Sequence, residues 1–244
     1  MMEDLKQALS FLTIIPLPGI RKGNLKRAMI FFPLVGFLIG AVSLMILLGL
    51  STSLLPRLEA LILVTLPILL TGGLHLDGFA DFCDGFGGKN KEEILRIMRD
   101  SRVGVWGAAG VVLLLIWKME LLAALPSRGG AFLLSLTASR WAQVVLSYFL
   151  PYANPEGGLG ESVAKKVKVR ELAGATGFLA VLIFFLGAPG LVTFLALLPF
   201  LALAGFLFFK RVGGVTGDLL GAASEATEVY VLLIFFLIET GGLS

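Results

Sequence analysis

Charged residues are scarce in this chain, and that scarcity decides its class. Of its 244 residues 15% are charged and 57% are hydrophobic, whereas a soluble domain usually carries about 25% charged residues. Apolar runs of roughly 20 residues are long enough to cross a bilayer as helices. The sequence therefore predicts an all-α, polytopic membrane protein and excludes an ordinary soluble domain.

Cysteine is nearly absent, and several catalytic motifs are missing. A single cysteine, Cys83, cannot form an intramolecular disulfide, so the redox compartment is not readable from it. There is no GxxxxGK[ST] phosphate-binding loop and no HExxH, which argues against an ATPase and a zinc protease. No linker and no cleavable signal peptide are recognisable, so we expect one domain over residues 1–244.

Hydrophobic patterning predicts about seven membrane spans after an N-terminal segment at 1–27. Within that segment, an amphipathic helix over 4–15 is expected to lie at the membrane surface. The polar stretch around 89–102 is too charged to cross. The expected spans cover about 28–50, 58–74, 103–125, 130–150, two spans within 172–209 that break near Gly187, and 218–238.

The distribution of Lys and Arg predicts the orientation of these spans. Nearly all of those outside the spans fall on one side, while Arg57 and Arg128 fall on the other. The positive-inside rule then places the N-terminus in the cytoplasm and the C-terminus outside. The glycine-rich and acid-rich motifs share that predicted cytoplasmic side, so we expect the active site there, at the cell membrane.

The stretch 72–88, GGLHLDGFADFCDGFGG, concentrates most of the chemistry. Its aspartates Asp77, Asp81 and Asp84 are spaced i, i+4 and i+7, so a helix would present all three carboxylates on one face. Such a cluster of anions favours a hard divalent cation, Mg²⁺ first. The plainer interpretation, a solvated acidic loop, explains the many interspersed glycines poorly, because glycine permits close backbone approach to a ligand.

A second acidic group lies in the last span. Asp218, Glu225 and Glu228 share one helix face, and ionisable groups at such depth usually have a partner. One interpretation adds them to the metal site, and the other pairs the two glutamates with Arg140 or Lys118. The preceding RVGGVTGD, with Gly214 and Gly217, is typical of a loop that holds phosphate at a helix N-terminus.

Together these features predict phosphoryl transfer from an activated diphosphate. Carboxylates hold Mg²⁺, the metal bridges phosphate oxygens, and arginines neutralise the charge that develops in the transition state. The basic character is explained by this site and by topology, so no nucleic acid is expected. The candidate cations are Arg96, Arg99, Arg102, Arg140, Lys165 and Lys166.

Two further side chains of the motif have alternative interpretations. His75 is a candidate general base, but a structural hydrogen bond is an equal alternative. Asp81 is the other candidate for the base. Cys83 lies off the aspartate face and is expected to be packed rather than reactive.

Motifs along most of the chain resemble those of the cobalamin synthase family, the adenosylcobinamide-GDP ribazoletransferases. One position departs from the pattern: Ile14 stands where the family often has arginine. The motifs that carry the resemblance are SFLTIIPLP at 10–18, FPLVG at 32–36, GGLHLDGFADFCDG at 72–85, RIMRDSRVGVWG at 96–107, SR at 139–140, YANPEGGLG at 152–160 and GGVTGDLLGAASEATE at 213–228.

The resemblance implies the last step in assembling the nucleotide loop of cobalamin. Adenosylcobinamide-GDP would donate its adenosylcobinamide phosphate to α-ribazole or α-ribazole 5′-phosphate, releasing GMP, with Mg²⁺ as the metal and homo-oligomers an open question. We assign Asp77 and Asp81, with His75 and Arg102, to catalysis. Metal ligands are expected among Asp77, Asp81, Asp84, Asp218, Glu225 and Glu228, and substrate contacts among Arg96, Asp100, Arg140, Gly214 and Gly217, with Asp100 as a positioning group.

Two rival functions fit less well. A CDP-alcohol phosphotransferase also uses membrane aspartates with Mg²⁺, but its DGxxARx₈GxxxDxxxD pattern does not match 77–84. A cation-coupled transporter would explain intramembrane acids, but the two halves of the chain do not repeat, as they do in many transporters.

Overall fold

The computed structural model describes residues 1–17, 25–50, 54–153 and 167–241. These residues are almost entirely helical, and an isolated β-bridge joins Tyr152 to Val215. The elements are α1 Met2–Leu12, α2 Leu25–Ala28, η1 Met29–Phe31, α3 Phe32–Gly49, α4 Pro56–Thr71, α5 Leu74–Asp84, η2 Gly85–Gly87, α6 Lys91–Met98, α7 Val105–Ala124, α8 Arg128–Phe149, α10 Val169–Val212 and α11 Gly217–Glu239.

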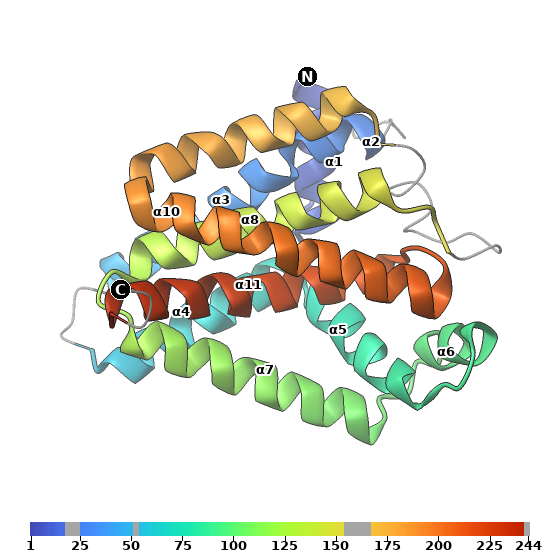
Figure 1. Cartoon of the computed structure of the whole chain (residues 1–244). Coiled ribbons are helices and arrows are strands. Elements are labelled where there is room, and N and C mark those ends of the chain that lie inside the picture. Colours follow the sequence, from blue (N-terminus) through green and yellow to red (C-terminus); the bar gives the residue numbers. More distant parts are fainter. Residues whose placement is uncertain (18–24, 51–53, 154–166, 242–244) are drawn as a thin grey trace.

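The architecture is a helical bundle of the kind expected for a polytopic membrane protein (Figure 1). Among the described residues, four helices are long and apolar enough to cross a membrane, or five if the bent pair α4–α5 counts as one span. Helices form over each of the expected spans, but α8 is not among the helices that are apolar enough to cross, and the total of seven spans stays a prediction. The N-terminal helix also forms and ends at Leu12, before the prolines that follow.

The longest helix, α10, is a hairpin. Its 44 residues would extend about 66 Å if straight, more than twice the roughly 30 Å of a hydrocarbon core. Gly187 leaves helical geometry at φ 64° and ψ −140°, and Figure 1 shows the two arms of α10 running in opposite directions. The predicted break near Gly187 is therefore confirmed.

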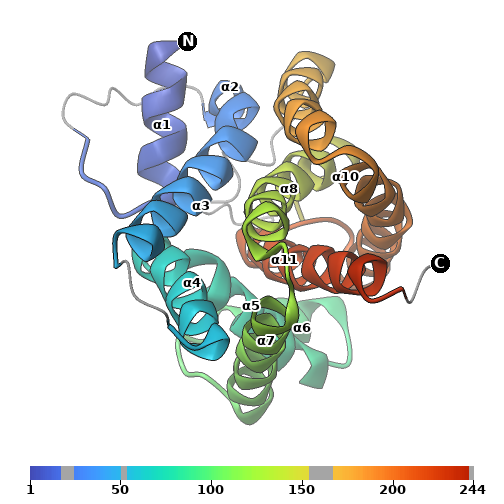
Figure 2. The same ribbon diagram turned by 90° about the vertical axis from the view of Figure 1, so that its left-hand side faces the viewer.

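The core of the bundle is built on α8 and α11. Viewed along the bundle, α8 lies among α3, α10 and α11, with α4, α5 and α7 on the other side of α11 (Figure 2). In α11, 56% of an apolar stretch of 18 residues is buried, whereas 28% of the corresponding stretches of α7 and α10 is buried. The outer helices therefore present apolar side chains to lipid, while the inner pair carries buried polar groups.

The termini of the helices lie at two opposite ends of the bundle. The end of α8, the turn between α10 and α11, helix α6 and the first turn of α7 lie toward the right in Figure 1. The opposite end is tied by ion pairs, Arg57 to Glu120 and Arg128 to Glu59. The first of these ends brings the glycine-rich and acid-rich motifs together.

Candidate active site

A sharp break between α4 and α5 sets the position of the aspartate motif. Gly72 and Gly73 have φ of 63° and 74°, in the left-handed region that other residues rarely adopt. The axes of α4 and the following helical segment are bent by 94°. Helix α5 therefore starts inside the bundle and runs toward the end that carries α6 (Figure 1).

Helix α5 confirms the helical spacing inferred for the three aspartates. Asp77 is exposed, and Asp81 and Asp84 are half-buried. Helix α11 crosses α5 at Gly78, where a Cβ atom would lie 2.8 Å from the Cα of Asp218. Asp81 lies close enough to Asp77 and Asp218 to interact with both electrostatically. The fold thus brings Asp218, which is distant in sequence, to Asp77 and Asp81.

Asp84 faces a different partner, the first turn of α7. Its two carboxylate oxygens accept hydrogen bonds from the backbone N–H groups of Gly104 at 2.7 Å and Gly107 at 2.8 Å. A Cβ atom at either glycine would lie 2.4 Å from a carboxylate oxygen. Asp84 therefore caps α7 through its orphan N–H groups, and its assignment as a metal ligand stays a prediction.

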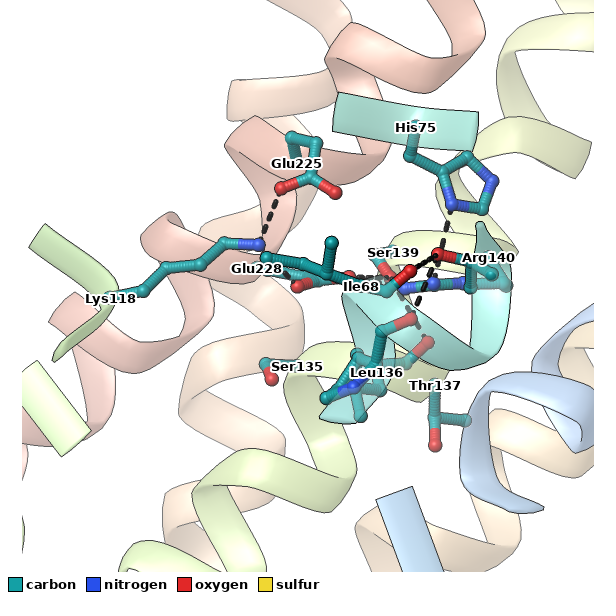
Figure 3. Close-up of polar contacts among 12 residues, drawn as sticks. Ile68, His75, Lys118, Ser135, Leu136, Thr137, Ser139, Arg140, Glu225 and Glu228 are labelled. Atoms are coloured by element: carbon teal, nitrogen blue, oxygen red, sulfur yellow. Dashed lines mark hydrogen bonds and ion pairs between the residues drawn. The ribbon is translucent and has the colours of Figure 1, made fainter. Parts of the chain in front are cut away.

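Glu225 and Glu228 lie deeper in the bundle, in a buried ionic cluster with Lys118 and Arg140 (Figure 3). Lys118 Nζ lies 2.5 Å from Glu225 Oε2 and 2.6 Å from Glu228 Oε2. Arg140 Nη1 pairs with Glu228 Oε1 and donates to Ser139 Oγ at 2.7 Å. The alternative that paired the two glutamates with these cations is thus confirmed, and their role as metal ligands stays a prediction.

The cluster joins four helices. Two cations and two carboxylates balance in charge, which a low-dielectric interior requires, and a cavity of about 20 Å³ beside them has room for a water molecule. His75 on α5 places Nδ1 3.3 Å from Arg140 Nη2. Because arginine only donates, Nδ1 accepts and the ring proton is assigned to Nε2. His75 is 4% exposed, so its side chain is less accessible to a substrate hydroxyl than that of the half-buried Asp81. Its role as a base stays a prediction.

The segment after α6 holds a preorganised arginine. The Arg102 guanidinium donates to both carboxylate oxygens of Asp100, at 3.0 and 2.7 Å. These hydrogen bonds lower the pKa of Asp100 to about 2, so the carboxylate stays ionised at neutral pH. Arg96 is exposed on α6, while Arg140 is buried and faces the ionic cluster. Lys165 and Lys166 lie outside the described residues.

The GGVTGD loop leads directly into α11. The N–H of Val215 donates to the carbonyl of Pro151 at 2.9 Å, and Thr216 Oγ1 accepts from the N–H of Leu219 at 3.2 Å as the N-cap of α11. Gly214 is buried against Pro151, and Gly217 is exposed at the first position of α11. The predicted phosphate contacts at Gly214 and Gly217 stay predictions.

An open groove of about 910 Å³ lies beside Asp77. Its walls come from the end of α1, the α4–α5 break, α5 and α7, and most of its surface is apolar. Ile14, Val103 and Val112 are exposed on it. The groove therefore offers a large apolar wall next to a carboxylate, which suits an amphipathic ligand.

The described residues hold no group of three or more His, Cys, Asp or Glu side chains arranged to bind a metal by themselves. Mg²⁺ usually binds through one or two carboxylates, waters and substrate phosphates, without an all-protein cage. The oxygen donors of Asp77, Asp81 and Asp218 fit that mode, and their mutual repulsion favours a cation. Glu225 and Glu228 do not fit it, because Lys118 and Arg140 already neutralise them.

From the sequence, Lys118 was named only as an alternative partner of the two glutamates and not as a residue of the candidate site. A lysine in the apolar segment that became α7 was a usable signal, because buried charges in a membrane need partners. The capping role of Asp84 had a weaker signal, two glycines about twenty residues downstream. Neither contact follows from local spacing, because each joins helices that are distant in sequence.

Comparison with known proteins identifies a family. Residues 4–236 match the family model of cobalamin-5-phosphate synthase. A relative from Chlorobium phaeobacteroides, named adenosylcobinamide-GDP ribazoletransferase, is 36% identical over 94% of this chain and 96% of its own length. Proteins with the same name from Chlorobaculum parvum and Escherichia coli are 34% and 36% identical, over 96% and 92% of this chain and 95% and 96% of their own.

No solved structure matches this chain. The family model covers nearly the whole sequence, and the expected resemblance is confirmed by relatives that align from end to end. The chain therefore belongs to the cobalamin-5-phosphate synthase family.

Proposed function

We propose that this protein is a membrane-embedded adenosylcobinamide-GDP ribazoletransferase. It transfers the adenosylcobinamide phosphate of adenosylcobinamide-GDP to α-ribazole or α-ribazole 5′-phosphate and releases GMP. Family membership supports the reaction. The observation that carries the site is the meeting of Asp77, Asp81 and Asp218 at the α5–α11 crossing, beside an apolar groove.

The metal proposed for this site is Mg²⁺, held by Asp77, Asp81 and Asp218 together with the diphosphate of the donor. When bound, it would neutralise charge on the transferring phosphoryl group and on the leaving GMP. Asp81 interacts electrostatically with both Asp77 and Asp218, so its replacement should weaken metal binding most.

The chemistry proposed is an in-line displacement. An acceptor hydroxyl oxygen bonds to the phosphorus next to adenosylcobinamide, and the bond from that phosphorus to the bridging oxygen breaks. The electron pair leaves with GMP, and a carboxylate, in our assignment Asp81, takes the hydroxyl proton. Arg96 and Arg102 lie on exposed segments near this end of the bundle, where they would contact phosphate.

The groove beside Asp77 is proposed to hold the corrinoid part of the donor. Its apolar walls suit a bulky amphipathic group, and Asp77 of the proposed metal site lines it. The charge distribution supports an active site on the cytoplasmic face of the cell membrane.

The test is a reconstituted reaction. Detergent-purified protein is mixed with adenosylcobinamide-GDP, α-ribazole and Mg²⁺, and both GMP and the corrinoid product are measured. We expect product from the wild type, none with EDTA, and a loss of at least about 100-fold in Asp81→Ala, as for removal of a group that stabilises the transition state.

Glu92→Ala is the matched control, because Glu92 is an exposed carboxylate on α6 away from the α5–α11 crossing. It should retain wild-type activity. Absence of product from folded wild-type protein would contradict the function. Normal activity of Asp81→Ala would contradict the site and leave the function standing.

A further inference from the structure

A second apolar cavity lies on the opposite side of the bundle from the aspartate groove, between α8 and the second arm of α10. It measures about 490 Å³. Trp141, Leu146 and Leu201 form its buried floor, and Phe149, Phe206 and Phe209 stand exposed at its rim. Its lining is apolar throughout, so it has no group with which to orient a polar substrate.

The dimensions of the cavity match one leaflet of a bilayer. At about 1.5 Å per residue, the lining stretches 141–150 and 198–209 are about 13 and 16 Å long. Half of a hydrocarbon core is about 15 Å. Trp141 closes the inner end, since its ring lies 5.5 Å from that of Phe194 and its Nε1–H donates to Thr176 Oγ1 at 3.0 Å. The cavity thus runs from the centre of the bundle to the end where α8 and α10 finish.

A cation stands at the outer end of this cavity. Lys210 Nζ lies 6.0 Å from the ring centroid of Phe206, which lines the cavity. Lys210 is exposed near the C-terminus of α10, at the same end as the cations of α6. The guanidinium carbon of the next residue, Arg211, lies 5.9 Å from the ring centroid of Phe86, so Arg211 faces a different surface.

We propose that this cavity binds one anionic phospholipid, with an acyl chain along Trp141 and Gly205 and its phosphate at Lys210. An apolar slot one leaflet deep that ends at an ammonium group has the shape and charge of such a lipid. A juxtamembrane lysine contributes about fivefold to the affinity for anionic over neutral lipid. This site is separate from the aspartate site, and it does not depend on the proposed reaction.

The test is native mass spectrometry of the purified protein titrated with phosphatidylglycerol or phosphatidylethanolamine. A Cβ at Gly205 makes ordinary contacts, 3.4 Å from Leu146 Cδ2, so Gly205→Phe extends its ring into the cavity without a backbone clash. We expect Gly205→Phe to weaken binding of both lipids at least tenfold. Lys210→Gln should weaken phosphatidylglycerol binding about fivefold and phosphatidylethanolamine binding less, because the ammonium group of that headgroup offsets the charge of its phosphate.

Two matched variants control for the substitutions. Gly177→Phe lies on the first arm of α10 with open space around it, and Lys89→Gln removes an exposed lysine remote from the cavity. Both should bind lipid as the wild type does. If Gly205→Phe does not fold, Gly205→Leu and Lys210→Gln carry the test.

Three outcomes would overturn the proposal. The first is unchanged lipid binding in the Gly205 variants. The second is an equal loss of both lipids in Lys210→Gln. The third is a change from dimer to monomer in Gly205→Phe with lipid binding intact, which would make the cavity an interface between two copies of the chain.

Discussion

Asp81 and Asp84 lie three residues apart on α5 and have different surroundings. Asp81 is near two other carboxylates, Asp77 and Asp218, and that crowding is relieved by a cation. Asp84 is satisfied by the N–H groups of Gly104 and Gly107. The same residue type in the same motif is therefore suited to metal binding at one position and to helix capping at the other.

Replacing Asp84 should affect stability more than metal binding. Asp84→Ala removes both hydrogen bonds to the first turn of α7, and loss of such a cap costs about 1–2 kcal/mol. Thermal unfolding in detergent should show this loss, while Asp81→Ala unfolds at or above the wild-type temperature because like-charge repulsion is removed. An Asp84→Ala protein with wild-type stability and no Mg²⁺ response would instead make Asp84 a ligand.

The buried glutamates show the same dependence on surroundings. Glu228 meets Lys118 and Arg140 together, and Glu225 meets Lys118. Removal of one partner from a buried ion pair leaves an uncompensated charge in a low-dielectric interior.

Lys118→Met should therefore destabilise the protein strongly, by roughly 3–5 kcal/mol. The double variant Lys118→Met/Glu225→Gln restores the charge balance and should recover part of that loss. Unfolding in mixed SDS–detergent micelles measures both. A double variant as unstable as the single one would show that the charge of Glu225 is not coupled to Lys118.

Among the helices, the crossing of α5 and α11 positions the site. Gly78 lets the backbone of Asp218 approach closely, and Gly221 of α11 packs near the carbonyl of His75 at the same crossing. The break at Gly72 and Gly73 gives α5 the angle that this crossing needs. The carboxylates of two distant motifs meet because these backbones lie in contact.

A methyl group at Gly78 should separate the two helices. In Gly78→Ala the new Cβ would lie 2.8 Å from both the Cα and the carbonyl oxygen of Asp218, and such overpacking costs about 1–3 kcal/mol. We expect a lower unfolding temperature and an increased Mg²⁺ requirement in the assay.

Gly87→Ala is the matched control, because a Cβ there meets nothing within 4 Å. It should behave as the wild type. Equal behaviour of the two alanine variants would mean that α5 and α11 do not depend on close contact at Gly78.

Over the whole molecule, basic residues and chemical motifs gather at one end of the bundle. Helix α6, which begins at Lys91, lies at that end with the aspartate site, and the start of α4, which carries Arg57, lies at the other (Figure 1). The positive-inside rule assigns the first end to the cytoplasm.

Labelling of introduced cysteines tests this orientation. Cys83 is 8% exposed, so Cys83→Ser gives a silent background. In intact spheroplasts, a membrane-impermeant maleimide should label Leu55→Cys, which replaces an exposed side chain. Lys89→Cys should be labelled only after the spheroplasts are lysed. The reverse pattern would place the aspartate site outside.

Local signals in the sequence predicted the helical class, the apolar segments, the break at Gly187 and the family. Hydrophobic length and periodicity are set by the bilayer and by helix geometry, so they can be read along the chain. The spacing of Asp77, Asp81 and Asp84 likewise predicted one helix face. These features depend on residues close together in sequence.

The partners of each charged side chain depended on contacts between distant segments. Asp218 joins Asp77 and Asp81, Asp84 caps α7, and Glu225 and Glu228 turn to Lys118. One helix face looks the same in sequence whether its neighbour supplies a cation, an N–H group or another carboxylate. Packing of α5, α7, α8 and α11 makes that choice, because in a low-dielectric bundle each buried charge must meet its partner at close range.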